Sequence, residues 1–359
     1  MSEYARGKEV CMKDVIDHGH CKIGCKLKIG IVVPTYKKDL WDKFYTKWNW
    51  DCPDYSVTLY MVEDNPKKTI KAPKGRVCHY DWSDIDKDLG EDSWIISRGS
   101  SSIRSYGYLK AYQDNMDYIL TLDDDCYPDD RNKTITELID SHLVGLDKPK
   151  EYSNTFHVGA ALFANNDLWM RGSPIRYRKP RRPVISIGGW NHNPDLDAWT
   201  QLENQTPHLS CMPTVVNVPK YSGITMCGMN VMFERSVIPI AYFLLQGERW
   251  GVDRVDDIWA GLFMKKVLDY FDLPMCINGA ASIFHDRASD ALVSLKKEGL
   301  TLQETELLWD RLSTLDLVGD SLTKAYRDIV FMSKSEWFGK REYGSKLKEA
   351  MITWVNLFE

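Results

Sequence analysis

The sequence predicts an α/β fold built on a mostly parallel, doubly wound sheet that is flanked by helices. Three observations indicate this class: short apolar runs that each end in polar residues, helix-like stretches between those runs, and an ordinary globular composition. Of the 359 residues, 43% are hydrophobic and 27% are charged, which is enough apolar material for a large core. Strands that alternate with helices over about a hundred residues are typical of a parallel sheet.

The first three predicted strands are residues 29–33, 57–62 and 118–122. Each is a short continuous apolar run, as expected for a strand that is buried on both faces. A tryptophan-rich helical stretch follows the first strand, and residues 101–114 form a predicted helix that leads into the third. Ligands bind beyond the carboxyl ends of such strands. Polar residues stand at all three ends: Pro34-Thr35, Glu63-Asp64 and Asp123-Asp124-Asp125.

The second half of the chain is less regular. Further strands are predicted at residues 157–163, 183–187 and 224–233. A helix is predicted at residues 257–269, because Ile258, Leu262, Phe263 and Val267 fall on one apolar stripe. Beyond residue 300 amphipathic helices alternate with polar loops. We therefore expect an N-terminal extension at 1–27, an α/β domain at 28–300 and a helical C-terminal region at 301–359.

Bulk properties exclude several classes of protein. The net charge of −5 argues against a chain-wide electrostatic grip on nucleic acid. No apolar run is long enough for a membrane span, and the first residues lack the apolar stretch of a signal peptide. Nine cysteines at irregular spacing favour reduced thiols over a disulfide framework. We expect a cytoplasmic protein.

Two features remain open at this level. The N-terminal extension gathers potential zinc ligands, although their spacing fits no compact zinc motif: Cys11, His18, His20, Cys21 and Cys25. The basic run at residues 176–182 could grip phosphates or nucleic acid, and could equally be an exposed loop.

The sharpest feature is the triple aspartate that directly follows the third predicted strand. Adjacent carboxylates repel one another, and burial would raise their pKa values unless a cation neutralised them. Hard oxygen ligands suit Mg²⁺ or Mn²⁺. Alternation along an extended chain would put Asp123 and Asp125 on the same side. A solvated acidic turn or a helix N-cap is the alternative, but the position after a buried strand favours a metal.

Three other segments could contribute to such a site. Arg104, near the start of the helix before the acidic strand, could reach the same sheet edge, or could be a surface arginine. His285 ends an apolar stretch and could complete the coordination with a neutral imidazole, although a lone histidine is more often structural. Asp256 and Asp257 open the predicted helix, where one can cap it and the other can act as a base or hold sugar hydroxyls.

With these residues in view, the sequence resembles the reversibly glycosylated polypeptide family, whose plant members are UDP-arabinopyranose mutases. Family patterns such as IVIPT, DDxWAG, WHSKAS and PDYDAPTQ have counterparts in consistent order over roughly residues 28 to 300. The matching segments are residues 31–35 (IVVPT), 123–126 (DDDC), 194–201 (PDLDAWTQ), 226–230 (MCGMN), 256–261 (DDIWAG), 284–289 (FHDRAS) and 295–298 (LKKE).

The resemblance implies a GT-A-like glycosyltransferase fold, a requirement for Mn²⁺ or Mg²⁺, no flavin, and self-glycosylation at an arginine that falls on Arg178. It implies nucleotide contacts at Pro34, Thr35, Asp64, Arg104, Asp123 and Asp124. Metal ligands are expected at Asp123, Asp125 and His285, and reaction chemistry at Arg178, Asp256 and Asp257. Sugar contacts are expected at Trp190, Asp195, Asp197, Asn230 and Trp259.

The surroundings of Arg178 depart from the family pattern, and Ile187 stands where the family has a histidine. The expected activity is interconversion of the pyranose and furanose forms of a UDP-sugar, most simply UDP-arabinose. The alternative is transfer of the sugar to an external acceptor, either a protein or a nucleic acid. A scaffold with a vestigial nucleotide site is a third reading. We also expect a homo-oligomer.

Overall fold

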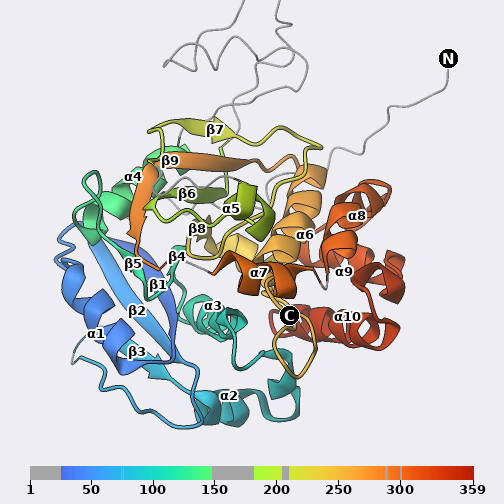
Figure 1. Ribbon diagram of the computed structural model, residues 1–359, viewed down its shortest axis with the longest axis horizontal. Coiled ribbons are helices and arrows are strands. Elements are labelled where there is room, and N and C mark those ends of the chain that lie inside the picture. The colour runs from blue at the N-terminus through green and yellow to red at the C-terminus, as the bar shows by residue number, and fades with distance from the viewer. Residues whose placement is uncertain are drawn as a thin grey trace, which may run out of the picture.

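A computed structural model describes residues 26–73, 75, 77–147, 182–203, 210–287, 290–299 and 301–359. Across these residues nine strands form one sheet in the order β3-β2-β1-β4-β8-β6-β9-β5, with β7 paired to β9 (Figure 1). The strands are β1 (Leu27–Thr35), β2 (Tyr55–Glu63), β3 (Val77–Tyr80), β4 (Tyr118–Leu122), β5 (Cys126–Tyr127), β6 (Ile185–His192), β7 (Val215–Asn217), β8 (Asn230–Glu234) and β9 (Met275–His285).

The half of the sheet that carries the predicted strands is parallel. β1 pairs in parallel with β2 and β4, and β2 pairs in parallel with β3. β8 then runs antiparallel to β4 and β6, and β9 runs parallel to β6. The three predicted strands are confirmed as β1, β2 and β4. The prediction at residues 183–187 corresponds to β6, the one at 224–233 is wrong before Asn230, and the one at 157–163 lies outside the described residues.

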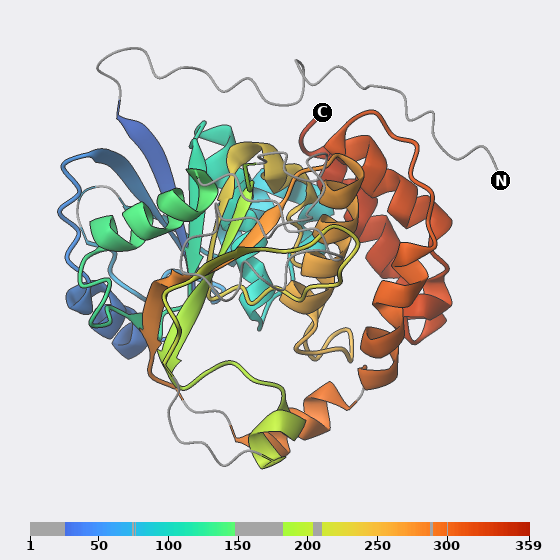
Figure 2. The same cartoon turned by 90° about the horizontal axis from the view of Figure 1, so that it is seen from above.

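Helices cover both faces of the sheet, which confirms the predicted α/β class. α1 and α4 lie on one face, and α3, α6 and the last three helices lie on the other (Figures 1 and 2). The helices are α1 (Lys38–Lys47), α2 (Trp82–Leu89), α3 (Arg104–Gln113), α4 (Ile135–Asp147), α5 (Ala198–Glu203), α6 (Asp256–Tyr270), α7 (Ala291–Glu298), α8 (Leu302–Ser313), α9 (Leu322–Met332) and α10 (Arg341–Asn356).

The sheet has a hydrophobic core on each of its faces, and the side chains of β1 point alternately into one and the other. Ile31 and Val33 pack on the α1 side, whereas Val32 packs on the α3 side. Helix α3 comes unusually close to the sheet at Gly107, where a Cβ atom would lie 2.5 Å from a methyl carbon of Val32. Any larger side chain there would push away the helix whose first residue is Arg104.

The helical C-terminal region is confirmed, and it shares its core with the sheet. The ring of Trp354 on α10 stacks on Tyr242 with 5.3 Å between centroids. The Tyr343 hydroxyl donates a hydrogen bond of 2.7 Å to the Leu245 carbonyl. These contacts attach α10 to the loop that follows a short 3₁₀ helix at Arg235–Ile240. Among the described residues no helix has the length and apolar character that a membrane crossing requires.

A buried histidine joins α4 to the sheet. The Nε2–H of His142 donates to Asn230 Oδ1 at 3.0 Å, and Nδ1 lies 2.9 Å from the Ser186 hydroxyl. The Asn230 amide donates in turn to two carbonyls, of Gly189 and Ala281, which fixes its orientation and leaves its oxygen to accept from the ring. Burial lowers the pKa of His142 from 6.5 to about 4.

This histidine should make stability fall as the pH drops from 6.5 towards 4. The unfolded chain takes up a proton in that window and the folded chain does not, so His142 can remove about 3 kcal/mol from the free energy of unfolding. Urea unfolding at pH 7 and pH 4.5 measures the change. His142→Gln keeps an amide in place of the ring and should show a smaller loss over the same window. Equal losses in both proteins would contradict this role.

Candidate active site

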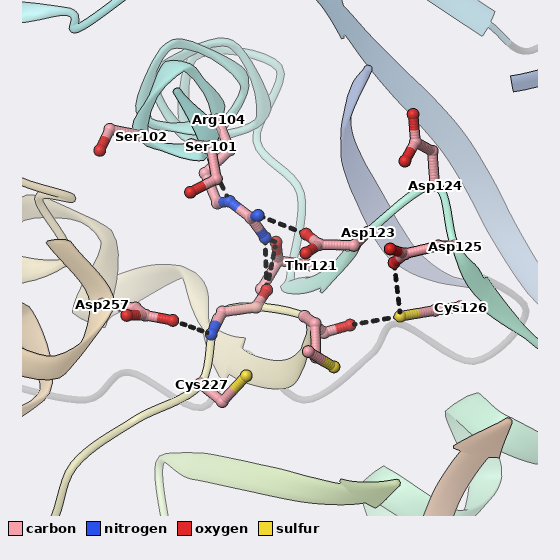
Figure 3. A network of polar contacts seen from close by, with 12 residues as sticks. Ser101, Ser102, Arg104, Thr121, Asp123, Asp124, Asp125, Cys126, Cys227 and Asp257 are labelled. Carbon is pink, nitrogen blue, oxygen red and sulfur yellow. Dashed lines mark hydrogen bonds and ion pairs between the residues drawn. The ribbon is translucent and has the colours of Figure 1, made fainter. Parts of the chain in front are cut away.

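The triple aspartate forms a turn at the carboxyl edge of the parallel strands. The amide of Cys126 donates to the Asp123 carbonyl at 3.1 Å, so the segment is not the extended chain that the sequence suggested. Asp123 and Asp125 nevertheless lie on the same side, as predicted, because Asp124 points away from both of them (Figure 3). Its carboxylate accepts a 2.6 Å hydrogen bond from Thr35, the residue after Pro34 at the end of β1. Burial outweighs that bond and raises the pKa of Asp124 to about 7.

Asp125 faces the histidine that the sequence put forward as its partner. β9 runs antiparallel to β5 and places His285 opposite Cys126. The distance from His285 Nε2 to Asp125 Oδ2 is 3.7 Å. Both residues are buried, with 6% and 2% of their surfaces exposed, and neither of these two atoms makes a hydrogen bond. Buried polar atoms without hydrogen bonds are costly unless another group compensates them, and here Arg287 Nε, at 3.0 Å from Asp125 Oδ2, is such a group.

The imidazole of His285 is held in a defined orientation. Its Nδ1 lies 2.6 Å from the Asn193 carbonyl, and because a carbonyl only accepts, Nδ1 carries the proton. In the neutral ring the lone pair is therefore on Nε2, towards Asp125, as in histidines that bind metals. Burial lowers the pKa of His285, but the Asp125 carboxylate outweighs burial and raises it above the usual value.

These residues fit a divalent cation that takes its remaining ligands from a substrate. Within the described part of the chain no group of three or more His, Cys, Asp or Glu side chains forms a ready-made metal site. An aspartate and a histidine with orphaned atoms provide two ligands, and Asp123 lies next to them in the same turn. Mg²⁺ in particular is commonly bound by one or two carboxylates together with substrate phosphates.

Arg104, for which a nucleotide contact is predicted, lies in the interior and contacts protein atoms. Its side chain is 2% exposed, and its guanidinium binds Asp123 and the Gly228 carbonyl. It also donates to Thr121 Oγ1 at 2.9 Å and to the Ser101 carbonyl at 3.0 Å. With its donors directed to protein atoms, Arg104 positions Asp123 and the loop before β8 (Figure 3).

The loop before β8, at residues 226–229, connects Arg104 to the start of α6. Its Gly228 amide donates to Asp257 Oδ2 at 2.8 Å. A Cβ atom at Gly228 would lie 2.5 Å from the Phe243 ring and 3.3 Å from Arg104, so only glycine fits between them. The loop, the arginine and the helix start are therefore packed as one unit.

The two aspartates that open α6 are in different environments. Asp256 is buried, and its Oδ2 accepts hydrogen bonds of 3.0 Å from the hydroxyls of Ser101 and Ser102. Asp257 is half-buried. Burial, followed by the charges of Asp256 and Asp195, raises the pKa of Asp257 well above its usual value. Neither side chain caps α6, whose N-cap residue is a valine. Both lie in its first turn, where the helix dipole favours carboxylates.

Asp195 contacts this loop at the residue before Gly228. The thiol of Cys227 donates to Asp195 Oδ2 at 3.0 Å, and Arg254 Nη2 lies 3.9 Å from the other oxygen. Burial raises the pKa of Cys227 well above its usual value, so its sulfur remains a neutral donor. Asp195 and Asp257 thus flank residues 227 and 228.

Two residues predicted to contact the sugar lie in the interior instead. Asn230 is 1% exposed and its amide is used within the sheet, as described above. Trp259 is fully buried, and its indole donates to Thr305 Oγ1 on α8 at 2.9 Å. Both are structural residues because the elements that pack over them close off the surface that a ligand would need.

Three further predicted residues make contacts within the protein. The carboxylate of Asp64 accepts from the amides of Gly99 and Ser100 at 3.0 and 2.8 Å, which anchors the loop before Arg104. Asp197 accepts from the Thr200 amide and hydroxyl in the first turn of α5. Trp190 packs against the core on the α1 side, and its buried indole N–H has no hydrogen-bond partner. Whether any of these contacts a substrate stays a prediction.

The predicted acceptor residue Arg178 lies outside the described residues, as do the N-terminal cysteines and histidines. Of the basic run only Arg182 is described, and it donates to the Leu146 carbonyl and the Tyr118 hydroxyl. Sequence reasoning missed Arg287, whose Nε lies 3.0 Å from Asp125 Oδ2. Its position two residues after His285 was the available signal.

A sequence model of the family described as reversibly glycosylated polypeptide matches residues 25–359. The chain belongs to the reversibly glycosylated polypeptide family. UDP-arabinopyranose mutase 1 of Oryza sativa subsp. japonica is 32% identical over 349 residues, which cover 93% of this chain and 91% of the relative. UDP-arabinopyranose mutase 2 of Arabidopsis thaliana is 30% identical, with coverages of 93% and 92%.

The reversibly glycosylated polypeptide match extends beyond residue 300, where the recognisable motifs end. It therefore includes α8 to α10, in agreement with the core that these helices share with the sheet. A solved structure of a mycobacterial protein aligns with 79% of this chain and 74% of its own length at 11% identity. Its TM-score of 0.41 is too low to define the fold.

Proposed function

We propose that this protein interconverts the pyranose and furanose forms of UDP-arabinose. Its family membership supports the assignment, because relatives named UDP-arabinopyranose mutase are 30% and 32% identical to it over 93% of its length. The observation that carries the proposal is the buried pair of Asp125 and His285, whose orphaned atoms face each other at the carboxyl edge of the sheet. Such edges are where α/β proteins bind nucleotides.

We propose further that Asp125 and His285, together with Asp123, hold Mn²⁺ or Mg²⁺. When bound, such a cation balances the negative charge of the diphosphate as it leaves the sugar. The protein prepares this site in two ways. Arg104 orients Asp123, and the Asn193 carbonyl keeps the lone pair of His285 on Nε2.

Conversion between ring sizes also requires proton transfer. A proton must leave the hydroxyl that closes on C1, and a proton must reach the oxygen of the ring that opened. Asp257 is suited to this exchange because burial raises the pKa of its carboxyl well above the usual value, which favours the protonated form. We propose that Asp195, which accepts from the Cys227 thiol beside it, also accepts hydrogen bonds from sugar hydroxyls.

Incubation with UDP-arabinopyranose and Mn²⁺, followed by chromatography of the nucleotide sugars, tests the function. UDP-arabinofuranose should accumulate, EDTA should stop the reaction, and added Mn²⁺ should restore it. Binding of UDP without formation of the furanose would contradict the proposal. Release of UDP with the sugar on another acceptor would favour a transferase instead. Self-glycosylation at Arg178, homo-oligomer formation, a nucleic-acid acceptor and a cytoplasmic location stay predictions.

A further inference from the structure

Arg287 contacts the oxygen of Asp125 to which a metal ion would bind. Its Nε lies 3.0 Å from Asp125 Oδ2, the same atom that faces His285. The contact is an ion pair without hydrogen-bond geometry, since Oδ2 makes no hydrogen bond. The arginine side chain is 61% exposed. The Asp125 side chain is only 3% exposed, so its charge needs a cation beside it. Because the arginine is exposed and poorly aligned, a metal ion that compensates the same carboxylate can take its place.

The two arginines at this site thus differ in what they can do. Arg104 is buried and directs its guanidinium to Asp123, Thr121, Gly228 and Ser101. Arg287 forms an ion pair with Asp125 that lacks hydrogen-bond geometry, and its side chain is 61% exposed. A guanidinium matches the paired oxygens of a phosphate and binds them in a fork. Of the two, Arg287 has the donors to spare for a ligand.

We propose that Arg287 covers Asp125 in the absence of a divalent cation and binds the diphosphate of UDP once the cation has taken its place. This assignment rests on the proposed function, because it assumes that cation and diphosphate meet at Asp125. The two positive groups repel each other at one carboxylate oxygen, which favours displacement of the guanidinium by the cation. A displaced Arg287 remains tethered two residues from His285, next to any diphosphate that the cation draws in.

Two equilibrium measurements test the assignment without reference to turnover. Electron paramagnetic resonance of free Mn²⁺ gives the affinity for Mn²⁺ alone, and calorimetry gives the affinity for UDP in saturating Mn²⁺. In Arg287→Ala, Mn²⁺ alone should bind about threefold tighter or more, because a competing charge is gone. UDP with Mn²⁺ should bind about tenfold weaker or more, because a charge-assisted contact is lost. Arg287→Lys should lose less UDP affinity than the alanine variant.

Lys43→Ala is the matched control. Lys43 is an exposed cation that pairs with Asp286, the residue between His285 and Arg287, so the variant removes the same charge from the same neighbourhood without touching Asp125. Both of its affinities should stay within about twofold of wild type.

A fall in both affinities of Arg287→Ala would mean that the arginine is merely structural, and unchanged UDP affinity would also overturn the assignment. Absence of Mn²⁺ and UDP binding in the wild-type protein would overturn it as well. The proposed function fails by a different result, namely a wild-type protein that binds both Mn²⁺ and UDP but forms no UDP-arabinofuranose.

Discussion

Asp125→Asn should abolish the dependence of UDP binding on Mn²⁺ and, with it, formation of UDP-arabinofuranose. The substitution keeps the size of the side chain but removes the charge that faces His285 across 3.7 Å. Loss of a carboxylate ligand should weaken Mn²⁺ by roughly 100-fold or more, given that even supporting residues around metals change affinity by about 10- to 100-fold. Calorimetric titration with Mn²⁺ measures the loss, and circular dichroism checks that the protein is folded.

The neighbouring aspartate supplies the control for this variant. Asp124→Asn makes the same substitution in the same turn, but Asp124 has a pKa raised to about 7 and bonds to Thr35 rather than facing His285. An asparagine oxygen can still accept from that hydroxyl, so Mn²⁺ affinity should change by less than about tenfold. Equal losses in the two variants would show that general charge, rather than a ligand at Asp125, governs the site.

Arg104→Met should lower the free energy of unfolding by about 3–5 kcal/mol, since it breaks a buried ion pair from one side. Asp123 and the Gly228 carbonyl would lose their donor, and the buried Asp256 would lose a nearby positive charge. Urea unfolding measures the change. Arg98→Met is the matched surface variant, because Arg98 pairs with the exposed Asp86, and it should cost less than about 1 kcal/mol.

Comparable losses in these two arginine variants would contradict the buried role of Arg104. A second measurement separates positioning from folding. At a temperature where Arg104→Met is still folded, its affinity for Mn²⁺ should be lower than wild type, since Asp123 would no longer be held in place.

Local patterns predicted the parallel half of the fold because each of its strands is a continuous apolar run. β1, β2 and β4 were recognisable for that reason, together with the acidic turn after β4. β9 was recognised only at its end, because its sequence, MCINGAASIFH, mixes apolar residues with asparagine and glycine. No local pattern specifies that β9 pairs with β5, and it is this pairing that brings His285 to Asp125.

The errors at the site have a common physical origin. A sequence does not show which polar residues become buried. Arg104 and Asn230 were recognisable as polar side chains close to the site in the sequence. Both are buried, and there Arg104 holds Asp123 while Asn230 joins neighbouring strands. Trp259 was expected at a sugar and is covered by α8. Arg287, by contrast, is exposed. Its contact with Asp125 depends on the pairing of β9 with β5, which no local pattern specifies.

The stacking of Trp354 on Tyr242 also bears on how the chain matures during synthesis. The core on the α3 side of the sheet is complete only when Trp354, more than a hundred residues after Tyr242, has been synthesised. Until then a wide apolar surface stands open to other molecules in the cell. The fold therefore cannot be completed on a partly translated chain, and early release would leave a product that tends to aggregate rather than a smaller working enzyme.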